Sequence, residues 1–599
     1  MKKLISLILT VTMVFSLVVS SVYADDKSKG ASASGEGWNA RSEVEEGGAL
    51  EKAFKLVDIK TKKVPVYYDS EKDKGELTLA FFDEDGAVPY ISVSDVPDLA
   101  AKAYQVKYGD KDYKLTISND GDTIALTREN GCWMKMDFSK NTISFIDLDV
   151  FLQSATMAAL FDQAHSYGVT IPMVNELFEH MDNSYQRFGK SLTLPLSDYG
   201  IDLVKNGKNY YIPLAIINDF ILSPIYTLTV YNGNCVIMAK DGLLQREDNL
   251  LDVYFDAPTG DISPSMSRFN YNELCLSLDY HYGLQDIHGI TSFDELFIET
   301  GLKTRLLSED PNIVDNAISE FICQHLDDVH SAPVYQSYYS GKDFNMERNF
   351  GNDIMRKEKL SDHFKEVRTK YFPDGAPGYE EVGDTAYITF DEFTQIPRDA
   401  DYYKNPPTKA DTSDTVGLML YSYAQITREG SPVKNVVMDL SCNTGGESSA
   451  AAFVIATFLG EGTYSIKDDI TGALMTENYR IDLNLDHKFD EKDSLAGYKL
   501  YCLESPASFS CGNLVPSVYK NSGKITLLGQ TSAGGSCIVL MAATAHGLIY
   551  NVSGPYRLAF TKNGSFYDID RGVEPDIFID NPENYYDRQA LTEYIHGLY

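Results

Sequence analysis

Short alternating runs of hydrophobic and polar residues fill the chain from about residue 50 to 150. Leu77–Phe82 and Thr123–Leu126 are two such runs, and the turn signals Asp85-Gly86 and Asp120-Gly121 lie close to them. Alternation with a period of two, interrupted by Asp-Gly turns, is typical of antiparallel sheet. The pattern therefore predicts a β-rich N-terminal region.

The hydrophobic spacing becomes helical further along the chain. Apolar residues recur at every fourth position from Ile313 to Phe321, so they lie on one face of a helix. That helix is expected to begin after Asp310-Pro311, because proline is favoured in a first turn, and to end near Asp327–Ser331. A helical segment is therefore predicted over 266–380.

From about residue 383 to the C-terminus, strand-type runs alternate with helix-type runs. This order is typical of a parallel sheet with crossover helices. The expected strands are Ala386–Phe390, Val433–Leu440, Tyr498–Leu503 and Lys524–Leu528, and the expected helices are Asp414–Arg428, Ser448–Leu459, Gly512–Asn521 and Asp587–Leu598.

The first residues have the pattern of a secretory signal peptide. Two lysines precede an apolar run from Leu4 to Val19, and the segment closes on Val22-Tyr23-Ala24, which predicts cleavage after Ala24. The alternative is a retained membrane anchor, but the run is shorter than a spanning helix needs. We expect a secreted or cell-surface protein with no membrane insertion after signal cleavage.

Together these patterns predict a multidomain α+β protein, because the chain is too long for one core. Residues 25–48, rich in Gly, Ser, Lys and Glu, are expected to be a disordered lead-in. The predicted division is 1–24 signal peptide, 25–48 lead-in, 49–150 β-rich domain, 151–265 second mixed α/β region, 266–380 helical segment and 381–599 α/β domain.

Charge and cysteine content restrict the classes of partner. A net charge of −35 argues against nucleic acid as a partner. The eight cysteines occur singly, without the paired spacings of a metal site or a disulfide scaffold. We therefore expect them to be small buried hydrophobic residues, and no metal or organic cofactor is implied.

Two polar turns of the α/β region carry the candidate chemistry. Ser510 lies between a predicted strand and a predicted helix, where a nucleophile is exposed and the helix dipole favours negative charge. The amide of Cys511 is placed to donate to an oxyanion, and Gly445 and Gly446 begin the next helix in the same way. The simpler alternative is two ordinary strand-to-helix turns, one of them capped by serine.

The order of motifs resembles that of the C-terminal-processing and tricorn-core serine peptidases, whose catalytic domain has a ClpP/crotonase-like fold. The resembling motifs are Thr385–Phe393, Val436–Gly446, Ser508–Asn513, Leu527–Gly535 and Gly572–Asp576. The resemblance places Ser510 at the nucleophile position. It implies a ClpP/crotonase-like serine peptidase domain and protein or peptide substrates.

Two departures from the family pattern affect the mechanism. Many relatives carry a lysine base after the turn that follows the nucleophile, but Ser532–Cys537 contains none. Tricorn-type members use a histidine instead, and the segment ending in His330-Ser331 resembles their motif, which makes His330 the candidate base. His546 is the main rival. Glu574 is the expected orienting acid, with Asp576 or Asp328 as alternatives. The second departure is Ser441, where many relatives carry arginine.

The sequence thus predicts a secreted serine endopeptidase with the triad Ser510, His330 and Glu574. Gly445, Gly446 and Cys511 are the expected donors of the oxyanion hole. One rival hypothesis is a non-catalytic cell-surface or ligand-binding protein on a peptidase-like fold, because a fold alone does not determine function. Another is a cell-wall structural protein. It rests on a weak repeat between Val88–Val93 and Tyr210–Ala215, which loosely resembles repeats of cell-wall-associated bacterial proteins.

Overall fold

The computed structural model describes residues 59–70, 73–109, 112–152, 176–181, 184–240, 244, 250–397 and 400–598. By its contacts the chain forms two units, Met1–Asp58 and Ile59–Tyr599. Only the second is described, so the predicted signal peptide and lead-in lie outside the described residues. Among the described residues, no helix is both long enough and apolar enough to cross a membrane.

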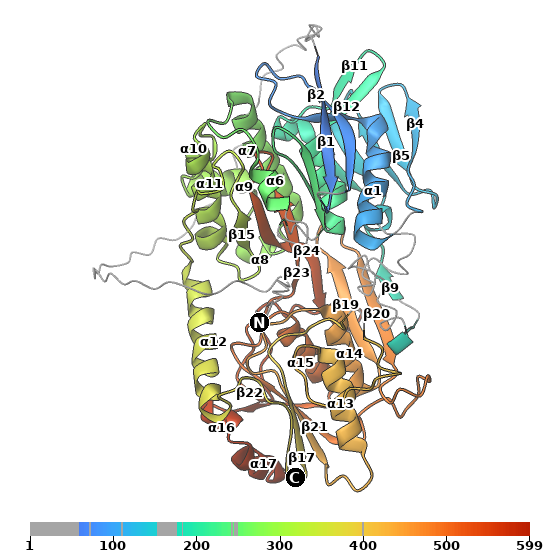
Figure 1. Cartoon of the computed structure of the whole chain (residues 1–599), viewed down its shortest axis with the longest axis vertical. Coiled ribbons are helices and arrows are strands. Elements are labelled where there is room, and N and C mark those ends of the chain that lie inside the picture. Colours follow the sequence, from blue (N-terminus) through green and yellow to red (C-terminus); the bar gives the residue numbers. More distant parts are fainter. Residues whose placement is uncertain are drawn as a thin grey trace, which may run out of the picture. The chain divides into compact units, whose positions relative to one another are not determined.

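The C-terminal α/β region is built on a six-stranded sheet in the order β16-β17-β18-β21-β22-β27 (Figure 1). All neighbouring strands from β17 to β27 are parallel, and β16 is antiparallel to β17. Their bounds are Gly378–Val382, Thr385–Thr389, Asn435–Asp439, Lys499–Glu504, Thr526–Gly529 and Ile577–Phe578. The predicted parallel sheet is confirmed.

Helices cover both faces of this sheet. In β18, Val436 and Met438 pack into one apolar core, whereas Val437 packs into another on the opposite face. Residues of α13 (Thr415–Thr427), α14 (Ser448–Leu459) and α15 (Cys511–Ser522) belong to the first core. Residues of α12 (Asn352–Tyr371), α16 (Glu583–Tyr586) and α17 (Arg588–His596) belong to the second. This three-layer arrangement buries both faces of the strands, as parallel sheets require.

A second sheet, which joins strands of the C-terminal region to strands from earlier in the chain, was not predicted from the sequence. It has the order β15-β24-β19-β20-β8, with β23 paired to β24 and β9 paired to β20. The bounds are Ala332–Tyr335, Ile549–Ala559, Gly462–Asp468, Leu474–Ile481 and Phe178–His180, then Cys537–Ala543 and Ser184–Arg187. Strand β15 begins two residues after His330, so its pairing with β24 ties the chain next to the candidate base to this sheet.

The N-terminal region contains two further sheets. Seven strands run in the order β11-β12-β3-β2-β1-β14-β13, and five in the order β10-β7-β6-β5-β4. The bounds of β1 to β7 are Lys60–Tyr68, Lys74–Phe81, Tyr90–Ser92, Thr116–Asp120, Thr123–Thr127, Trp133–Asp137 and Thr142–Phe145. Those of β10 to β14 are Leu192–Pro195, Val204–Asn206, Asn209–Pro213, Thr227–Tyr231 and Val236–Lys240. The β-rich prediction is confirmed.

Each of these sheets contains strands from both sides of residue 150, where a domain boundary was predicted. The predicted domain boundaries stay predictions. The two segments of the weak repeat noted in the sequence lie next to each other in the seven-stranded sheet. Tyr90–Ser92 and Tyr211–Pro213 pair with each other as antiparallel neighbours.

The predicted helical segment contains α7 (Pro264–His281), α9 (Phe293–Glu299), α11 (Pro311–Glu320) and α12. Helix α11 begins after Asp310, whose side chain accepts a hydrogen bond from the amide of Asn312, as expected. It continues as a π-helical turn, η5 (Phe321–Leu326), and ends at Asp327, which adopts a left-handed conformation with φ 45°. His330 lies in the short loop that joins η5 to β15.

All eight cysteines are buried and free of disulfide bonds, which confirms their interpretation as small buried hydrophobic residues.

Candidate active site

Ser510 occupies a strained turn between β21 and α15. Its φ of 55° and ψ of −122° lie outside the ordinary regions for a residue with a side chain. The surrounding chain holds this conformation: the amide of Ser510 donates to the carbonyl of Gly534 at 2.9 Å, and its carbonyl accepts from Asn513 and Leu514. A strained serine at the start of a helix is the arrangement that exposes a nucleophile.

The glycines of the facing turn allow the backbone to approach this serine. Gly445 and Gly446 have φ of 106° and 123°, which disfavour any side chain. A Cβ atom on Gly445 would lie 2.6 Å from the Cβ of Ser510, and one on Gly446 would lie 2.3 Å from the carbonyl oxygen of Phe393. We name residues Asn443–Glu447 the oxyanion turn. Glycine is required at both positions because the turn is pressed between Ser510 and Phe393.

Two of the three predicted amide donors are unoccupied. The amide of Gly445 donates to Oδ1 of Asn443 at 2.9 Å, so it is engaged within its own turn. In the described part of the chain, the amides of Gly446 and Cys511 donate to no other group. The thiol of Cys511 contacts the carbonyl of Gly446 at 3.2 Å, which brings the two residues together. The pair Gly446 and Cys511 is therefore the one suited to hold an oxyanion.

His330 lies beside the nucleophile turn. Its imidazole packs against the ring of Phe509, the residue before Ser510, with the ring centroids 4.6 Å apart. Burial lowers the pKa of His330 below its usual value, the negative charges of Asp328 and Asp570 oppose this, and the positive charge of Lys357 adds to it. The lowered pKa favours the neutral imidazole, which is the form that a general base needs.

The structure does not bring Glu574 to His330. The side chain of Glu574 is exposed, and its backbone carbonyl accepts from Lys520. Asp570, four residues earlier, instead has a carboxylate whose charge acts on His330. The predicted alternative Asp328 also acts on His330, but its carboxylate binds the amide of His330 and the hydroxyl of Ser331. Asp328 thus shapes the backbone of the loop.

A hydrogen-bonded network holds Asp570 in place. Its Oδ1 accepts from the amide of Ser536 at 2.9 Å and from the Ser536 hydroxyl at 3.0 Å. The Ser536 hydroxyl in turn accepts from Nε of the buried Arg557 at 2.9 Å. The sequence analysis named Glu574 and did not single out Asp570. The available signal was an acidic residue two positions before Gly572 in the closing motif.

The rival base His546 belongs to a different place in the fold. It is fully buried, and its Nε2 lies 2.8 Å from a carboxylate oxygen of the equally buried Asp315. Its Nδ1 lies 2.7 Å from the hydroxyl of Thr544 and 2.8 Å from Oδ1 of Asn270. With all these partners inside the core, His546 is a structural residue. No group of three or more His, Cys, Asp or Glu side chains in the described ranges is arranged to hold a metal ion.

Comparison with known proteins adds a family match to this geometry. Residues 384–579 match the model of peptidase family S41. No curated protein matches the chain. One similar solved structure is a putative peptidase from Parabacteroides merdae, 15% identical, which covers 56% of this chain and 96% of its own, with a TM-score of 0.39.

Two further structures are a photosystem II D1 C-terminal processing protease and the tricorn protease. The first is 19% identical, with coverage of 35% of this chain and 46% of its own and a TM-score of 0.25. The second is 11% identical, with coverage of 90% and 58% and a TM-score of 0.28. At these TM-scores the likenesses say nothing about function.

Proposed function

We propose that this chain is an exported endopeptidase with a Ser-His-acid triad. The proposal starts from residues 384–579, which form a domain of peptidase family S41 and make the chain a serine-type peptidase. Its substrates are proteins or peptides. The geometry that supports the proposal is the strained Ser510 facing the unoccupied amides of Gly446 and Cys511. Ordinary strand-to-helix turns do not need this combination.

In this mechanism Oγ of Ser510 attacks the carbonyl carbon of the scissile peptide bond while His330 accepts the hydroxyl proton. The carbonyl oxygen becomes an oxyanion, which accepts hydrogen bonds from the amides of Gly446 and Cys511. As the C–N bond breaks, the protonated His330 donates its proton to the leaving amine. Water, deprotonated by His330, then attacks the carbonyl carbon of the acyl-enzyme ester. The C–Oγ bond breaks, His330 returns the proton to Oγ of Ser510, and the new carboxyl terminus is released.

We assign the orienting acid to Asp570 rather than to Glu574. A carboxylate near the imidazole stabilises the imidazolium that forms during each proton transfer. The charge of Asp570 raises the pKa of His330 against the larger effect of burial, whereas Glu574 points into solvent. Glu574 stays a sequence prediction. Substituting each carboxylate in turn distinguishes the two candidate acids.

The absence of a lysine after the nucleophile supports a histidine-based mechanism over a Ser-Lys dyad. The segment Ser532–Cys537 contains no lysine. Lys520 bonds the carbonyl of Glu574, and Lys357 lies over the ring of Phe509 at 5.7 Å. Both lysines therefore have partners other than Ser510. Export is proposed from the signal-peptide pattern of residues 1–24 alone.

Two assays of the mature chain test the proposal. The first is covalent labelling with a fluorophosphonate, and the second is hydrolysis of casein. Wild type is compared with Ser510→Ala and His330→Ala, and circular dichroism confirms that all three fold. We expect labelling at Ser510 in wild type only, and loss of cleavage in both variants. Folded wild-type protein that is not labelled would support the rival binding-protein hypothesis instead.

A further inference from the structure

The oxyanion turn is held from behind by a short stretch of chain that follows β17. We name residues Phe390–Phe393 the bracing segment. The carbonyl of Phe390 accepts from Nδ2 of Asn443 at 3.1 Å, and that of Asp391 accepts from the amide of Thr444 at 3.0 Å. Further bonds join Phe393 to Gly445 and Glu447. The position of the Gly446 amide therefore depends on where the bracing segment lies.

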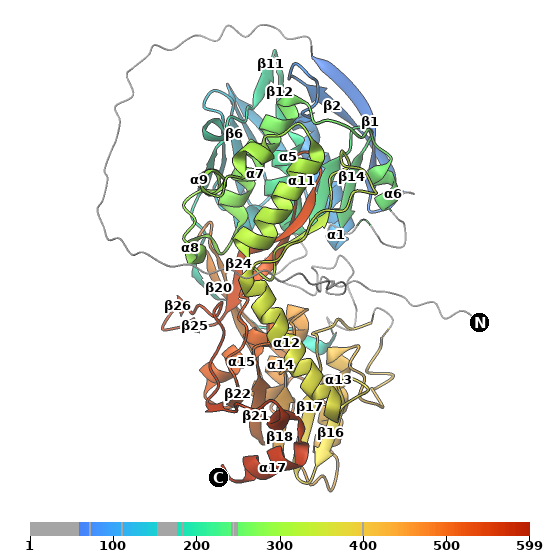
Figure 2. The same cartoon turned by 90° about the vertical axis from the view of Figure 1, so that its left-hand side faces the viewer.

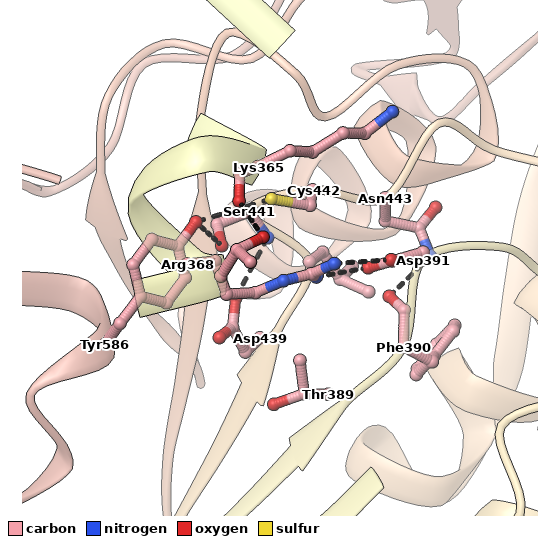
Figure 3. A network of polar contacts seen from close by, with 12 residues as sticks. Lys365, Arg368, Thr389, Phe390, Asp391, Asp439, Ser441, Cys442, Asn443 and Tyr586 are labelled. Atoms are coloured by element: carbon pink, nitrogen blue, oxygen red, sulfur yellow. Dashed lines mark hydrogen bonds and ion pairs between the residues drawn. The ribbon is translucent and has the colours of Figure 1, made fainter. Parts of the chain in front are cut away.

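A buried arginine from another element fixes the bracing segment. Arg368, in the last turn of α12, has a side chain that is only 7% exposed and forms a two-pronged ion pair with the carboxylate of Asp391 (Figure 3). Its Nη2 lies 2.6 Å from Oδ2 of Asp391. A bidentate arginine–carboxylate pair restricts both position and orientation.

This arginine lies beside Ser441, just before the oxyanion turn (Figure 3). Ser441 has a small side chain, whose hydroxyl lies 3.0 Å from the hydroxyl of Tyr586. Burial raises the pKa of the neighbouring Cys442 thiol to about 11, and the charge of Arg368 is close enough to oppose that shift. Figure 3 shows Arg368 reaching Asp391 beside Ser441 and Cys442. The charge of Arg368 therefore lies close to Cys442, the residue before the oxyanion turn.

The other end of the same helix is tied to the segment that carries His330. The carboxylate of Asp327 accepts hydrogen bonds from the amides of Asp353 at 2.7 Å and Ile354 at 2.9 Å, so it caps the first turn of α12. A Cβ atom on Gly351 would lie 2.3 Å from Cγ of Asp327, so only glycine permits this close cap. Asp327 is three residues before His330.

Helix α12 therefore connects the two halves of the site. From Asp353 to Arg368 it spans roughly 22 Å at the rise of an α-helix, and Figure 2 shows it as one continuous helix. We propose that α12 is a strut that sets the oxyanion turn relative to the base, and that Arg368 is a positioning residue of the oxyanion hole. This inference rests on the proposed peptidase function.

The test uses Arg368→Met, with Arg368→Lys as the conservative variant and Arg428→Met as the matched control. Arg428 also forms a two-pronged ion pair, with Glu381 at 2.5 and 2.8 Å, but it lies at the end of α13. The readouts are the fluorophosphonate labelling rate, kcat and KM on a cleaved casein peptide, and amide hydrogen exchange of the peptide spanning residues 440–447.

We expect Arg368→Met to lower kcat by about 10- to 100-fold with KM nearly unchanged, because a displaced oxyanion donor weakens only transition-state binding. Exchange of peptide 440–447 should accelerate. The acid limb of the pH profile should not move, because the base keeps its surroundings. Lysine should restore part of the rate, and Arg428→Met should match wild type in every readout. If Arg368→Met fails to fold, Asp391→Asn tests the same ion pair from its half-exposed side.

If folded Arg368→Met keeps the wild-type kcat, or the wild-type exchange of peptide 440–447, the proposed positioning role of Arg368 and α12 is wrong. Equal acceleration in Arg428→Met would overturn it too. Failure of the proposed function is a separate outcome: wild type would not be labelled at Ser510. Hydrogen exchange would still decide the role of Arg368, since it needs no catalysis.

Discussion

The imidazole of His330 rests on the ring of Phe509, with centroids 4.6 Å apart and the ring planes inclined at 51°. Phe509 is next to the proposed nucleophile, so the same residue that shapes the serine turn also supports the proposed base. Its ring is itself confined, because a Cβ atom on Gly535 would lie 2.4 Å from one of its carbons. A chain of contacts therefore runs from the Gly534-Gly535 turn through Phe509 to His330.

Substituting Phe509 by leucine removes this support while keeping an apolar side chain. Aromatic pairs contribute about 0.5–1.5 kcal/mol beyond the area they bury, which corresponds to a loss of about 2- to 10-fold in kcat/KM. Steady-state kinetics on a casein peptide measures it. Phe458→Leu removes a comparable pair, 5.4 Å from Tyr519 inside the core, and should affect stability without lowering kcat/KM. Equal kinetic losses in both variants would mean that the contact with His330 has no special role.

The identity of the orienting acid is tested by Asp570→Asn beside Glu574→Gln. Each change removes one negative charge with little change in volume. Loss of the triad acid lowers kcat by about 10⁴-fold in enzymes of this chemistry, so we expect that loss for Asp570→Asn. Glu574→Gln should retain wild-type kcat because its side chain is exposed and away from His330. The reverse result would restore Glu574 to the triad.

The acid limb of kcat/KM reports protonation of the proposed base. His330 is active when neutral, so activity falls as the pH drops through its pKa, which burial, aided by Lys357, holds below the usual value. Lys357→Met removes a positive charge that lowers this pKa. The pKa should therefore rise, and the acid limb should move to higher pH.

A control for this shift lies two residues further on the same helix. Lys359 is exposed, and its charge is not among those acting on His330. Lys359→Met changes the net charge equally but should leave the profile in place. A profile that is identical in wild type and Lys357→Met would show that the base is not His330 or that Lys357 does not face it.

The sequence predicted the α/β region well because its signals are local. Helix α14, for example, spans Ser448–Leu459 as expected, since a glycine turn precedes it and Gly460 ends it in a left-handed conformation. The second sheet was not predicted. Strand β24 is buried along almost its whole length, so it lacks the alternation of a strand with one exposed face. Its partner β15 lies about two hundred residues earlier in the chain.

The residues of the candidate site also fall into two groups, those visible in local motifs and those whose contacts exist only after folding. Ser510, Gly446 and Cys511 belong to turns whose chemistry is visible in a few consecutive residues. Asp570 was missed because its relation to His330 crosses 240 positions of sequence and exists only after folding. Arg368 was not singled out because nothing in the sequence of α12 indicates that its last turn reaches Asp391, although the two residues are only 23 positions apart.

The hydroxyl of Ser536 joins the proposed acid to a buried cation, and its removal should loosen that acid. Ser536→Ala deletes the bond to Oδ1 of Asp570 and leaves Nε of Arg557 without its acceptor. The amide of residue 536 still holds Asp570, so we expect a loss of about 10-fold in kcat, smaller than that of Asp570→Asn. Ser536→Thr keeps the hydroxyl and should recover most of the rate.

Ser465→Ala removes another buried hydroxyl, 2.8 Å from that of Thr476 in the second sheet. It should lower the melting temperature without changing kcat, whereas a parallel fall of kcat in both alanine variants would reduce the role of Ser536 to general stability.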